Sequence, residues 1–520
     1  MSAGTTVFPE ADDDSADGPG AAAGWRRLDR RTVLVSALVT AGVAAGAAVP
    51  TTLGLSGRFG FGPAVAWVLA GAVVLIASAA AGDHVRWRRT RYRVGAERVE
   101  LHTGLLLVKK RSLARERIRS VDLTAHPLQR VLGLVAVRIG TGEHSGNEST
   151  LELDPVPKAE GELLRRELLE RTATAAPGTH REGELVALDP RWIRYAPVSF
   201  VAPALGGAAA GGVMQVSDWF GAQGRVIDWI GDRFRDTSLI AVIMTLVAAA
   251  IAAGVVGALG LWVEMWWGYR LEREPGGTLR VRRGLLTSRS VSIEERRLRG
   301  VDLVEPLGIR PFGAARVDAI TTGLAKDDEE QHGDHNTLLP AAPRRVADAV
   351  AADVLREVTS PTGTPLTRHP RAARGRRSRR ACWAVVAPVA VLVVLGVLLT
   401  PVLLWIALAC AVVGLPAGLL LARDAYRGLG HAVSGDYLVV RSGTVRRSTA
   451  ALERAGVIGW TVRQTYFQRR AGVLSLTATT AAGSGAYTAY DADASEGLDF
   501  ASQAVPGLLE PFLERTPPAG

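Results

Sequence analysis

Carboxylate and imidazole side chains crowd one short stretch of this 520-residue chain, at residues 326–336. Oxygen and nitrogen groups of this kind are the ligands that divalent metal ions take in proteins. The spacing fits neither a helical His-Glu-x-x-His pair nor an Asp-x-Asp-x-Asp-Gly calcium loop. We therefore favour a solvated hairpin tip over a metal site and expect no bound metal. The residues concerned are Asp327, Asp328, Glu329, Glu330, His332, Asp334 and His335.

The sequence offers little else that could perform catalysis. No Gly-x-Gly-x-x-Gly follows a strand-like run, and neither a Walker-type Gly-Lys-Ser/Thr nor a Gly-x-Ser-x-Gly elbow occurs. The two cysteines, Cys382 and Cys410, lie inside apolar runs, which argues against a disulfide framework, a zinc site or a redox pair. We expect a protein that is not an enzyme and has no cofactor.

Three arginines, Arg130, Arg310 and Arg469, recur at one place in a repeated pattern. A guanidinium there could bind a phosphate or a partner's carboxylate, or it could fix a turn by bonding to backbone carbonyls. We favour the turn-fixing role and keep contact with a headgroup or partner as the alternative.

Six apolar runs are long enough to cross a bilayer, which takes about 20 helical residues. They form three pairs, and Thr400-Pro401 divides the last pair because proline interrupts the helical hydrogen bonds. Gly42-x-x-x-Gly46 and Gly207-x-x-x-Gly211 have the spacing of close helix packing, but in so glycine-rich a chain we interpret them as coincidence. The expected spans are 33–53, 62–81, 196–216, 238–266, 382–399 and 402–422.

Arginines, which dominate the net charge of +10, gather at one end of each span pair. Positive residues mark the cytoplasmic side, so we expect a multi-pass plasma-membrane protein with both termini and all three large segments in the cytoplasm. The run at 371–380 lacks the interleaved aromatic residues of a nucleic-acid site, so contact with anionic headgroups of the inner leaflet is favoured. Candidate headgroup or partner contacts are Arg86, Arg88, Arg89, Arg374, Arg376, Arg377, Arg379 and Arg380.

The segments between the span pairs are copies of one sequence. Ser112 to Leu123 matches Ser292 to Leu303 without a gap, an offset of 180 positions. An offset of 339 positions brings Gly104 onto Gly443. Internal repeats of this length indicate one structural unit written three times.

Each copy has the pattern of short strands followed by an amphipathic helix, at 159–171, 344–358 and 498–513. In the first helix, the spacing of Leu163, Leu164, Leu168 and Leu169 predicts that they lie on one face. We therefore expect an α+β membrane protein in which each helix pair precedes a sheet of about seven strands. The expected order is a disordered acidic arm 1–30, span pair 31–82, domain 86–173, linker 174–194, span pair 195–266, domain 267–358, basic linker 359–380, span pair 381–422 and domain 423–514.

A Glu-Arg-Ile-x-Ser-Val strand and a Gln-Arg-x-x-Gly turn, with a span pair before them, resemble the bacterial pleckstrin-homology-like (PH-like) domain. The first copy carries both motifs at 116–121 and 129–133. The threefold arrangement resembles that of YdbT-type membrane proteins. The resemblance implies a split-barrel or sandwich fold with a C-terminal helix at the inner membrane face, and it implies no reaction. The first hairpin turn, Gly95-Ala96-Glu97, lacks the basic cluster of phosphoinositide-binding relatives.

These features predict an envelope scaffold or adaptor whose cytoplasmic domains contact anionic lipids, a protein partner or further copies of the chain, and not nucleic acid. The alternative is a transport or export component involved in antimicrobial or envelope-stress resistance. The scarcity of ionisable residues within the spans weighs against that alternative. Hydrolysis at the acidic stretch is the least favoured function.

Overall fold

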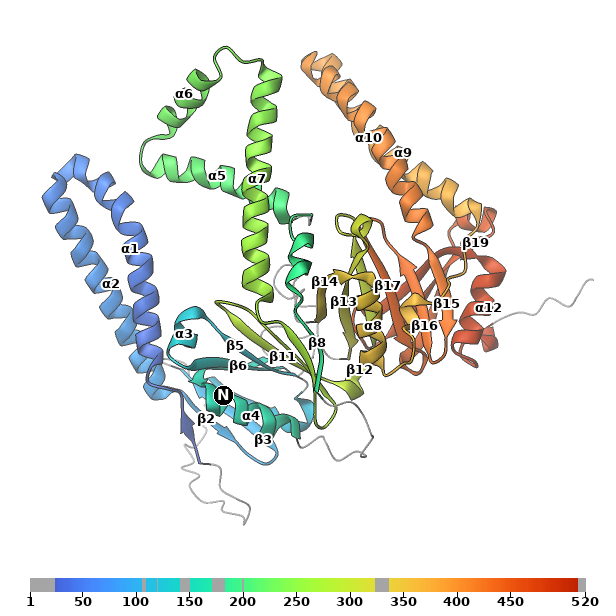
Figure 1. Cartoon of the computed structure of the whole chain (residues 1–520), viewed down its shortest axis with the longest axis horizontal. Helices are drawn as coiled ribbons and strands as arrows, with labels where there is room; N and C mark the ends of the chain where they lie inside the picture. Colours follow the sequence, from blue (N-terminus) through green and yellow to red (C-terminus); the bar gives the residue numbers. More distant parts are fainter. Residues whose placement is uncertain are drawn as a thin grey trace, which may run out of the picture.

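Long helices project from one side of a row of β-sheets (Figure 1). This computed structural model describes residues 24–104, 109–118, 120–140, 150–170, 183–198, 201–322 and 336–512. Three α/β units, called modules 1, 2 and 3, make up the row, and each carries one group of projecting helices (Figure 1).

Among the described residues, five helices are long and apolar enough to cross a membrane. Helices α1 and α2 pack together, as do α9 and α10. Their apolar side chains point outward, which fits a hydrocarbon solvent and not water. The five are α1 (Thr32–Phe59), α2 (Phe61–Arg89), α7 (Leu239–Trp266), α9 (Arg371–Leu398) and α10 (Val402–Arg427).

The third expected span is not among the five. Its residues form α5 (Val201–Trp219), which crosses α7 and continues into the short helix α6 (Gln223–Arg233) (Figure 1). Four glycines and a polar end at Gln215 and Asp218 lower the hydropathy of α5. Of the six expected spans, the structure therefore shows five as helices of sufficient length and hydropathy.

The three modules share one strand order, in two three-stranded groups that are followed by a helix. Module 1 has β2 (Arg91–Val94), β3 (Arg98–Thr103) and β4 (Lys109–Ala114), then β5 (Ser120–Ala125), β6 (Leu134–Gly140), β7 (Thr150–Pro157) and α4 (Lys158–Glu170). Module 2 has β9 (Arg270–Glu274), β10 (Thr278–Arg283) and β11 (Ser288–Glu294), then β12 (Leu298–Pro306), β13 (Ala314–Thr321), β14 (Thr337–Pro343) and α8 (Arg344–Leu355). Module 3 has β15 (Gly430–Ser434), β16 (Tyr437–Ser442) and β17 (Arg446–Glu453), then β18 (Val457–Arg463), β19 (Val473–Thr480), β20 (Ala486–Asp493) and α12 (Ala494–Ala504).

Short helices complete the modules. In modules 1 and 3 the second group of strands is interrupted by α3 (Pro127–Val131) and α11 (Tyr466–Arg470), whose glutamines Gln129 and Gln468 close capping boxes. Further turns are 3-10 helices: η1 (Arg115–Arg117), η3 (Pro190–Tyr195), η4 (Glu295–Arg297), η5 (Arg310–Phe312), η6 (Pro361–Gly363), η7 (Arg454–Gly456) and η8 (Glu510–Phe512).

The chain before each helix group belongs to the module that follows it. Strand β1 (Arg26–Arg27) pairs with β2, and β8 (Gly183–Ala187) pairs with β9. Thr367 forms the corresponding bridge to His431. These pairings correct the expected arm and linkers: residues 24–30 and 183–194 are ordered parts of modules, and the basic linker is helical from Arg371. Edge backbone groups that would otherwise face water gain partners this way.

Two sheets run across module boundaries, so the expected separate domains are fused. The seven-stranded sheet has the order β7-β6-β5-β11-β10-β9-β8, and the six-stranded sheet has the order β14-β13-β12-β17-β16-β15. Strand β5 of module 1 therefore pairs with β11 of module 2, and β12 of module 2 pairs with β17 of module 3.

The hydrophobic core follows the same continuity. Val439 and Ala451 of module 3 pack into the core of module 2, and Ile320 of module 2 packs into that of module 3. Helix α4 covers the module 1 core with Leu164 and Leu168, which lie one turn apart. Leu163, expected on the same face, is exposed instead.

Candidate functional site

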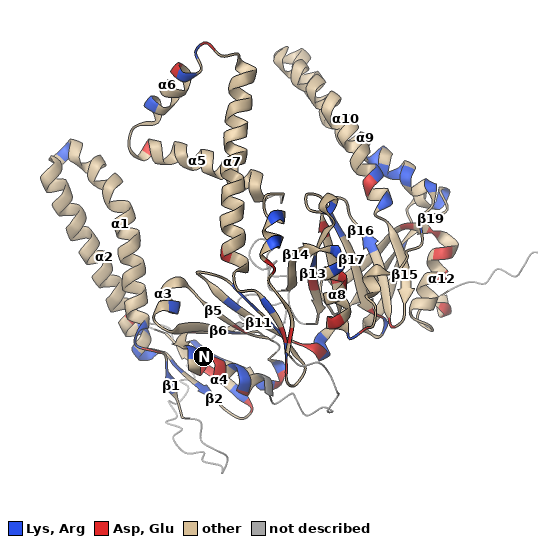
Figure 2. Cartoon of the chain, in the orientation of Figure 1, with Lys and Arg blue, Asp and Glu red and all other residues tan. Residues whose placement is uncertain are grey.

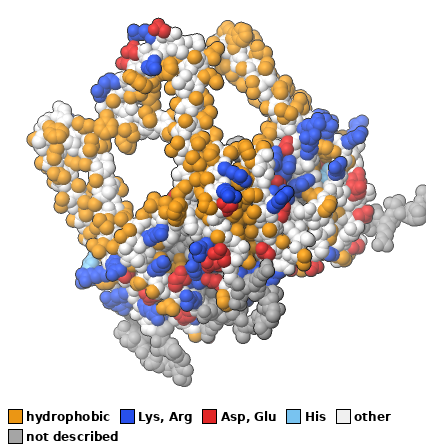
Figure 3. Space-filling view, viewed as in Figure 1, with side chains coloured by type: hydrophobic (Ala, Val, Ile, Leu, Met, Phe, Trp, Pro, Cys, Tyr) orange, Lys and Arg blue, Asp and Glu red, His pale blue; other side chains and the backbone are white. Residues whose placement is uncertain are grey.

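Basic side chains gather where the projecting helices meet the modules (Figure 2). Arg86, Arg88 and Arg89 form the last turn of α2, and all three are exposed. At the start of α9, Arg374, Arg379 and Arg380 are exposed as well. Beyond this level most of the helix surface is apolar, and charged side chains return at the tip around α6, as the space-filling view shows (Figure 3). We call these six arginines the basic collar.

Two arginines predicted to contact headgroups face the protein instead. Arg376 pairs with the Asp491 carboxylate, and Arg377 Nε lies 3.8 Å from it. Asp491 is buried and also accepts a hydrogen bond of 2.9 Å from Gln468 Nε2. A buried carboxylate needs such partners, because an unpaired charge in the interior is costly. Arg376 and Arg377 thus fasten α9 to module 3.

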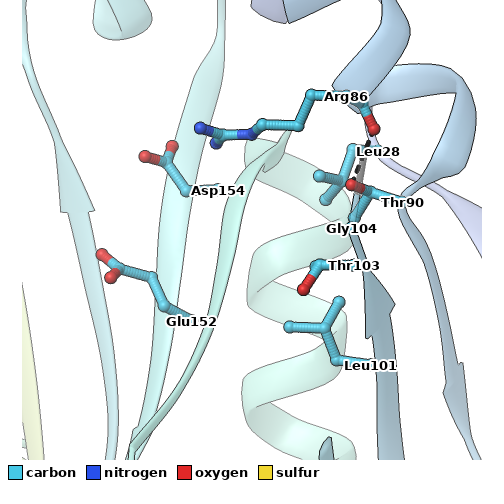
Figure 4. A pocket seen from close by; sticks show the side chains of 8 residues that line it. All are labelled: Leu28, Arg86, Thr90, Leu101, Thr103, Gly104, Glu152 and Asp154. Atoms are coloured by element: carbon cyan, nitrogen blue, oxygen red, sulfur yellow. Dashed lines mark hydrogen bonds between the residues drawn. The ribbon is translucent and has the colours of Figure 1, made fainter. Parts of the chain in front are cut away.

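A pocket of about 390 Å³ opens where α2 enters module 1 (Figure 4). Arg86 extends across it toward Asp154, and Glu152 lines the same wall (Figure 4). Burial raises the pKa of Asp154, while Gln129 Nε2 donates a hydrogen bond of 2.8 Å to its carboxylate. One guanidinium beside two carboxylates gives the pocket mixed charge, so it does not fit a purely anionic ligand.

Two of the three recurring arginines lie at the boundaries between modules. Arg130 donates to the carbonyl oxygen of Leu285 in module 2. Arg310 donates to the carbonyl oxygen of Thr444 in module 3 at 3.2 Å, and to Asp424 at 2.8 Å. Both arginines bond to backbone as expected, but the carbonyl belongs to the next module and not to their own turn.

Arg469 has no following module within the chain. Among the described residues its contact is with the ring of Tyr466, 6.0 Å from the guanidinium carbon to the ring centre. The third recurring arginine therefore lacks the carbonyl partner that the first two have.

A buried charge network joins α4 of module 1 to the first strands of module 2. Arg165 binds both oxygens of Glu274, at 2.7 and 3.1 Å, and its side chain is 4% exposed. Arg280 completes the network, 2.6 Å from Glu162 and 3.0 Å from Glu274. Two arginines and two glutamates thus neutralise each other between the modules. Helix amphipathicity alone gave no sign of this network.

Each boundary also holds one aspartate at an equivalent position, buried in the case of Asp122 and half-buried in the case of Asp302. Burial raises the pKa of Asp122 to about 7 and that of Asp302 to about 6. Backbone of Ser292 and the hydroxyl of Ser448, both from the following module, donate to these carboxylates and oppose the shift. The offset of 180 positions between the two aspartates was a signal in the sequence that could have identified them.

The acidic and histidine-rich stretch lies almost wholly outside the described residues, which resume at Asn336. Within the described part of the chain, no three His, Cys, Asp or Glu side chains are grouped to hold a metal ion.

The apolar helices and repeated α/β modules define a membrane protein built from tandem domains. The chain belongs to the Bacterial PH domain family, which it matches at residues 43–172, 225–358 and 386–503. It is similar to the UPF0699 transmembrane protein YdbT of Bacillus subtilis (strain 168), with 22% identity over 403 residues that cover 75% of this chain and 79% of that protein. No solved structure matches the chain significantly.

Proposed function

We propose that the protein is a membrane-anchored scaffold whose PH-like modules lie at the cytoplasmic face and hold anionic headgroups at the basic collar. The observation that carries this proposal is the exposure of the collar arginines at the module end of the helices. The far ends carry Arg58 alone or a balanced mixture of acids and bases between 218 and 236. Headgroup attraction of about 1 kcal/mol for each surface arginine would bind the modules to an anionic leaflet.

Placing all three modules on one side of the membrane requires six membrane crossings and not five. Each helix group starts and ends at neighbouring strands of one sheet: β1 and β2, β8 and β9, and the bridge between Thr367 and His431. A chain that leaves and re-enters one sheet edge must cross the bilayer an even number of times. Within the middle group, α5 and α6 would then supply the crossing that accompanies α7.

Cysteine labelling of the full chain in intact cells tests the topology. Cys382→Ala and Cys410→Ala remove the native thiols, and Ala222→Cys then marks the far end of the middle helix group. We expect a membrane-impermeant maleimide to label Ala222→Cys from outside and Asp436→Cys, in module 3, only after lysis. Labelling of Asp436→Cys in intact cells would contradict the cytoplasmic placement.

Lipid preference of the purified full chain tests the collar. In nanodiscs of phosphatidylcholine with a minority of phosphatidylglycerol, we expect several-fold enrichment of phosphatidylglycerol around the protein, measured by spin-labelled lipids and weakened by salt. Changing Arg88, Arg374, Arg379 and Arg380 to Gln should abolish the enrichment. The matched control changes Arg58, Arg225, Arg233 and Arg235 at the far ends and should retain it. Equal loss in both variants would exclude a site at the collar.

A further inference from the structure

The two boundaries between modules are the same interface, formed twice. Strand β5 pairs with β11 through Leu123 and Ser290, and β12 pairs with β17 through Leu303 and Thr449. Leu303 lies 180 positions after Leu123, so the two leucines are equivalent. Their strand partners are equivalent too, because Ser290 and Thr449 both correspond to position 110 of the first copy, at offsets of 180 and 339 positions. Both pairings are antiparallel and share one register.

The arginine contacts repeat with the same spacing. Arg130 donates to Leu285 and Arg310 donates to Thr444, and both carbonyls correspond to position 105 of the first copy. A strand edge and an arginine on one module therefore receive a hairpin of the next module, in the same way at each boundary.

The outermost modules each retain one half of this interface. Strand β18 of module 3 is equivalent to β5 and β12, and it is the end strand of the sheet β18-β19-β20. Its side chains Ile458 and Val462 are 63% and 43% exposed. At the other end of the row, β4 of module 1 is equivalent to β11 and β17, and it is the end strand of the sheet β1-β2-β3-β4.

We propose that β18 of one copy of this chain pairs with β4 of a second copy, continuing the row of modules from molecule to molecule. The register of the internal boundaries places Val462 opposite Lys110 and Arg463 opposite Lys109. Arg469 then takes the place that Arg130 and Arg310 hold within the chain. Among the described residues each of these strands pairs with a neighbouring strand on one side only, and end strands of this kind are templates for strand addition.

The second copy is the occupant that the repeat specifies, because its β4 is equivalent to β11 and β17, the strands that the internal boundaries already use. The contact is head to tail, so it produces either a closed ring or an open chain of molecules. All helix groups leave the row on one side (Figure 1), and a continued row keeps them on that side. The pairing does not depend on lipid binding.

Charge on the two edges distinguishes this pairing from lipid binding. Lys109 would face Arg463, and Lys110 and Arg469 add positive charge to the same two edges, so like charges meet. Salt screens this repulsion, and we expect pairing to strengthen as salt rises, whereas headgroup contact at the collar weakens. Basic residues do not prevent such a boundary, because Arg289 and Arg447 lie in the internal pairings.

Disulfide crosslinking of the full chain in neutral detergent, without its native cysteines, tests the proposal. The variant Arg463→Cys with Lys109→Cys places two thiols at a directly opposed pair, within disulfide reach. Mild oxidation should give intermolecular products, as a ladder for an open chain or one discrete band for a ring. The matched internal control is Thr124→Cys with Arg289→Cys, the equivalent pair at the first boundary, which should close within one molecule.

A second control tests the register. Ile458→Cys with Lys109→Cys moves one thiol five residues along β18, out of reach at about 3.3 Å per residue. The proposal is supported if this pair stays monomeric while Arg463→Cys with Lys109→Cys crosslinks. It is overturned if the internal control closes and Arg463→Cys with Lys109→Cys yields no intermolecular product, or if both pairs crosslink equally.

Discussion

Gly206 of α5 and Gly254 of α7 pack backbone against backbone where the two helices cross. A Cβ atom added to Gly206 would lie 2.2 Å from the carbonyl oxygen of Ala250, and one added to Gly254 would lie 2.0 Å from that of Ala202. Close approach through small residues is a common way for membrane helices to associate. The glycines singled out in the sequence, Gly207 and Gly211, have nothing within 4 Å of such an added atom.

Replacing Gly254 by Leu should separate α5 from α7. The side chain meets backbone that cannot turn aside, so we expect destabilisation of roughly 1–3 kcal/mol, typical of overpacking. Thermal denaturation of the purified full chain would show a lower midpoint. Gly260→Leu is the matched control, because nothing lies within 4 Å of a Cβ at that glycine of the same helix. Equal midpoints for the two variants would contradict the crossing.

The charge network between modules 1 and 2 should be sensitive to loss of one member. Arg165→Ala leaves Glu274 with Arg280 as its remaining partner in a buried setting, and breaking a buried pair costs about 3–5 kcal/mol. Arg138→Ala removes an exposed pair with Glu152 and should cost less than about 1 kcal/mol. Proteolysis at the boundary between the modules measures the difference, and similar cleavage rates in both variants would refute it.

Asp122 should make the first module boundary less stable as pH rises. Its pKa is about 7 in the folded chain, against about 3.9 when unfolded. The folded state therefore binds more protons between pH 4 and 7, and stability falls across that window by up to about 4 kcal/mol. Asp122→Asn removes the charge, so it should flatten this dependence and raise the denaturation midpoint at pH 8. Glu116→Gln, at an exposed acid, should leave the dependence unchanged.

The histidine pair of module 3 gives the opposite pH dependence. Nε2 of His369 lies 3.0 Å from Nδ1 of His431, and both rings are buried. Burial lowers the pKa of His431 to about 4, so the unfolded chain binds more protons between pH 4 and 6.5. Stability from this site is complete above that window and is lost as pH falls through it. After correction for the intrinsic pH dependence of amide exchange, the protection of β15 should fall toward pH 4.5 in the native chain and less so in His431→Gln. An equal loss of protection in the variant would exclude this origin.

The sequence pattern predicted those parts of the fold that depend on nearby residues, namely the repeated modules and the long apolar helices. The ungapped offsets identified three copies, and apolar length identified five of the projecting helices. The pairing of strands between modules could not be predicted from the sequence. Leu123 and Ser290, which pair, are far apart in the chain, and such a pairing leaves no periodic pattern in the sequence. Headgroup contacts were predicted from charge alone, which does not tell exposed Arg379 from Arg377, held against Asp491.

Substitution of Gly300 should disturb the second module boundary and leave the first intact. It pairs with Leu452, and an added Cβ would lie 2.0 Å from the carbonyl oxygen of Ala451 on β17. Gly300→Val therefore forces β12 away from β17, while the first boundary has Ser120 at the equivalent position and tolerates a side chain.

Two crosslinks report the boundaries separately in the cysteine-free chain that carries Gly300→Val. Glu305→Cys with Arg447→Cys spans the second boundary, and Thr124→Cys with Arg289→Cys spans the first. We expect closure of the second-boundary crosslink to slow at least tenfold, with the first-boundary crosslink unchanged. Because the two boundaries share one register but not this glycine, equal slowing of both would mean that the variant unfolds the chain as a whole, and no slowing would refute the close approach.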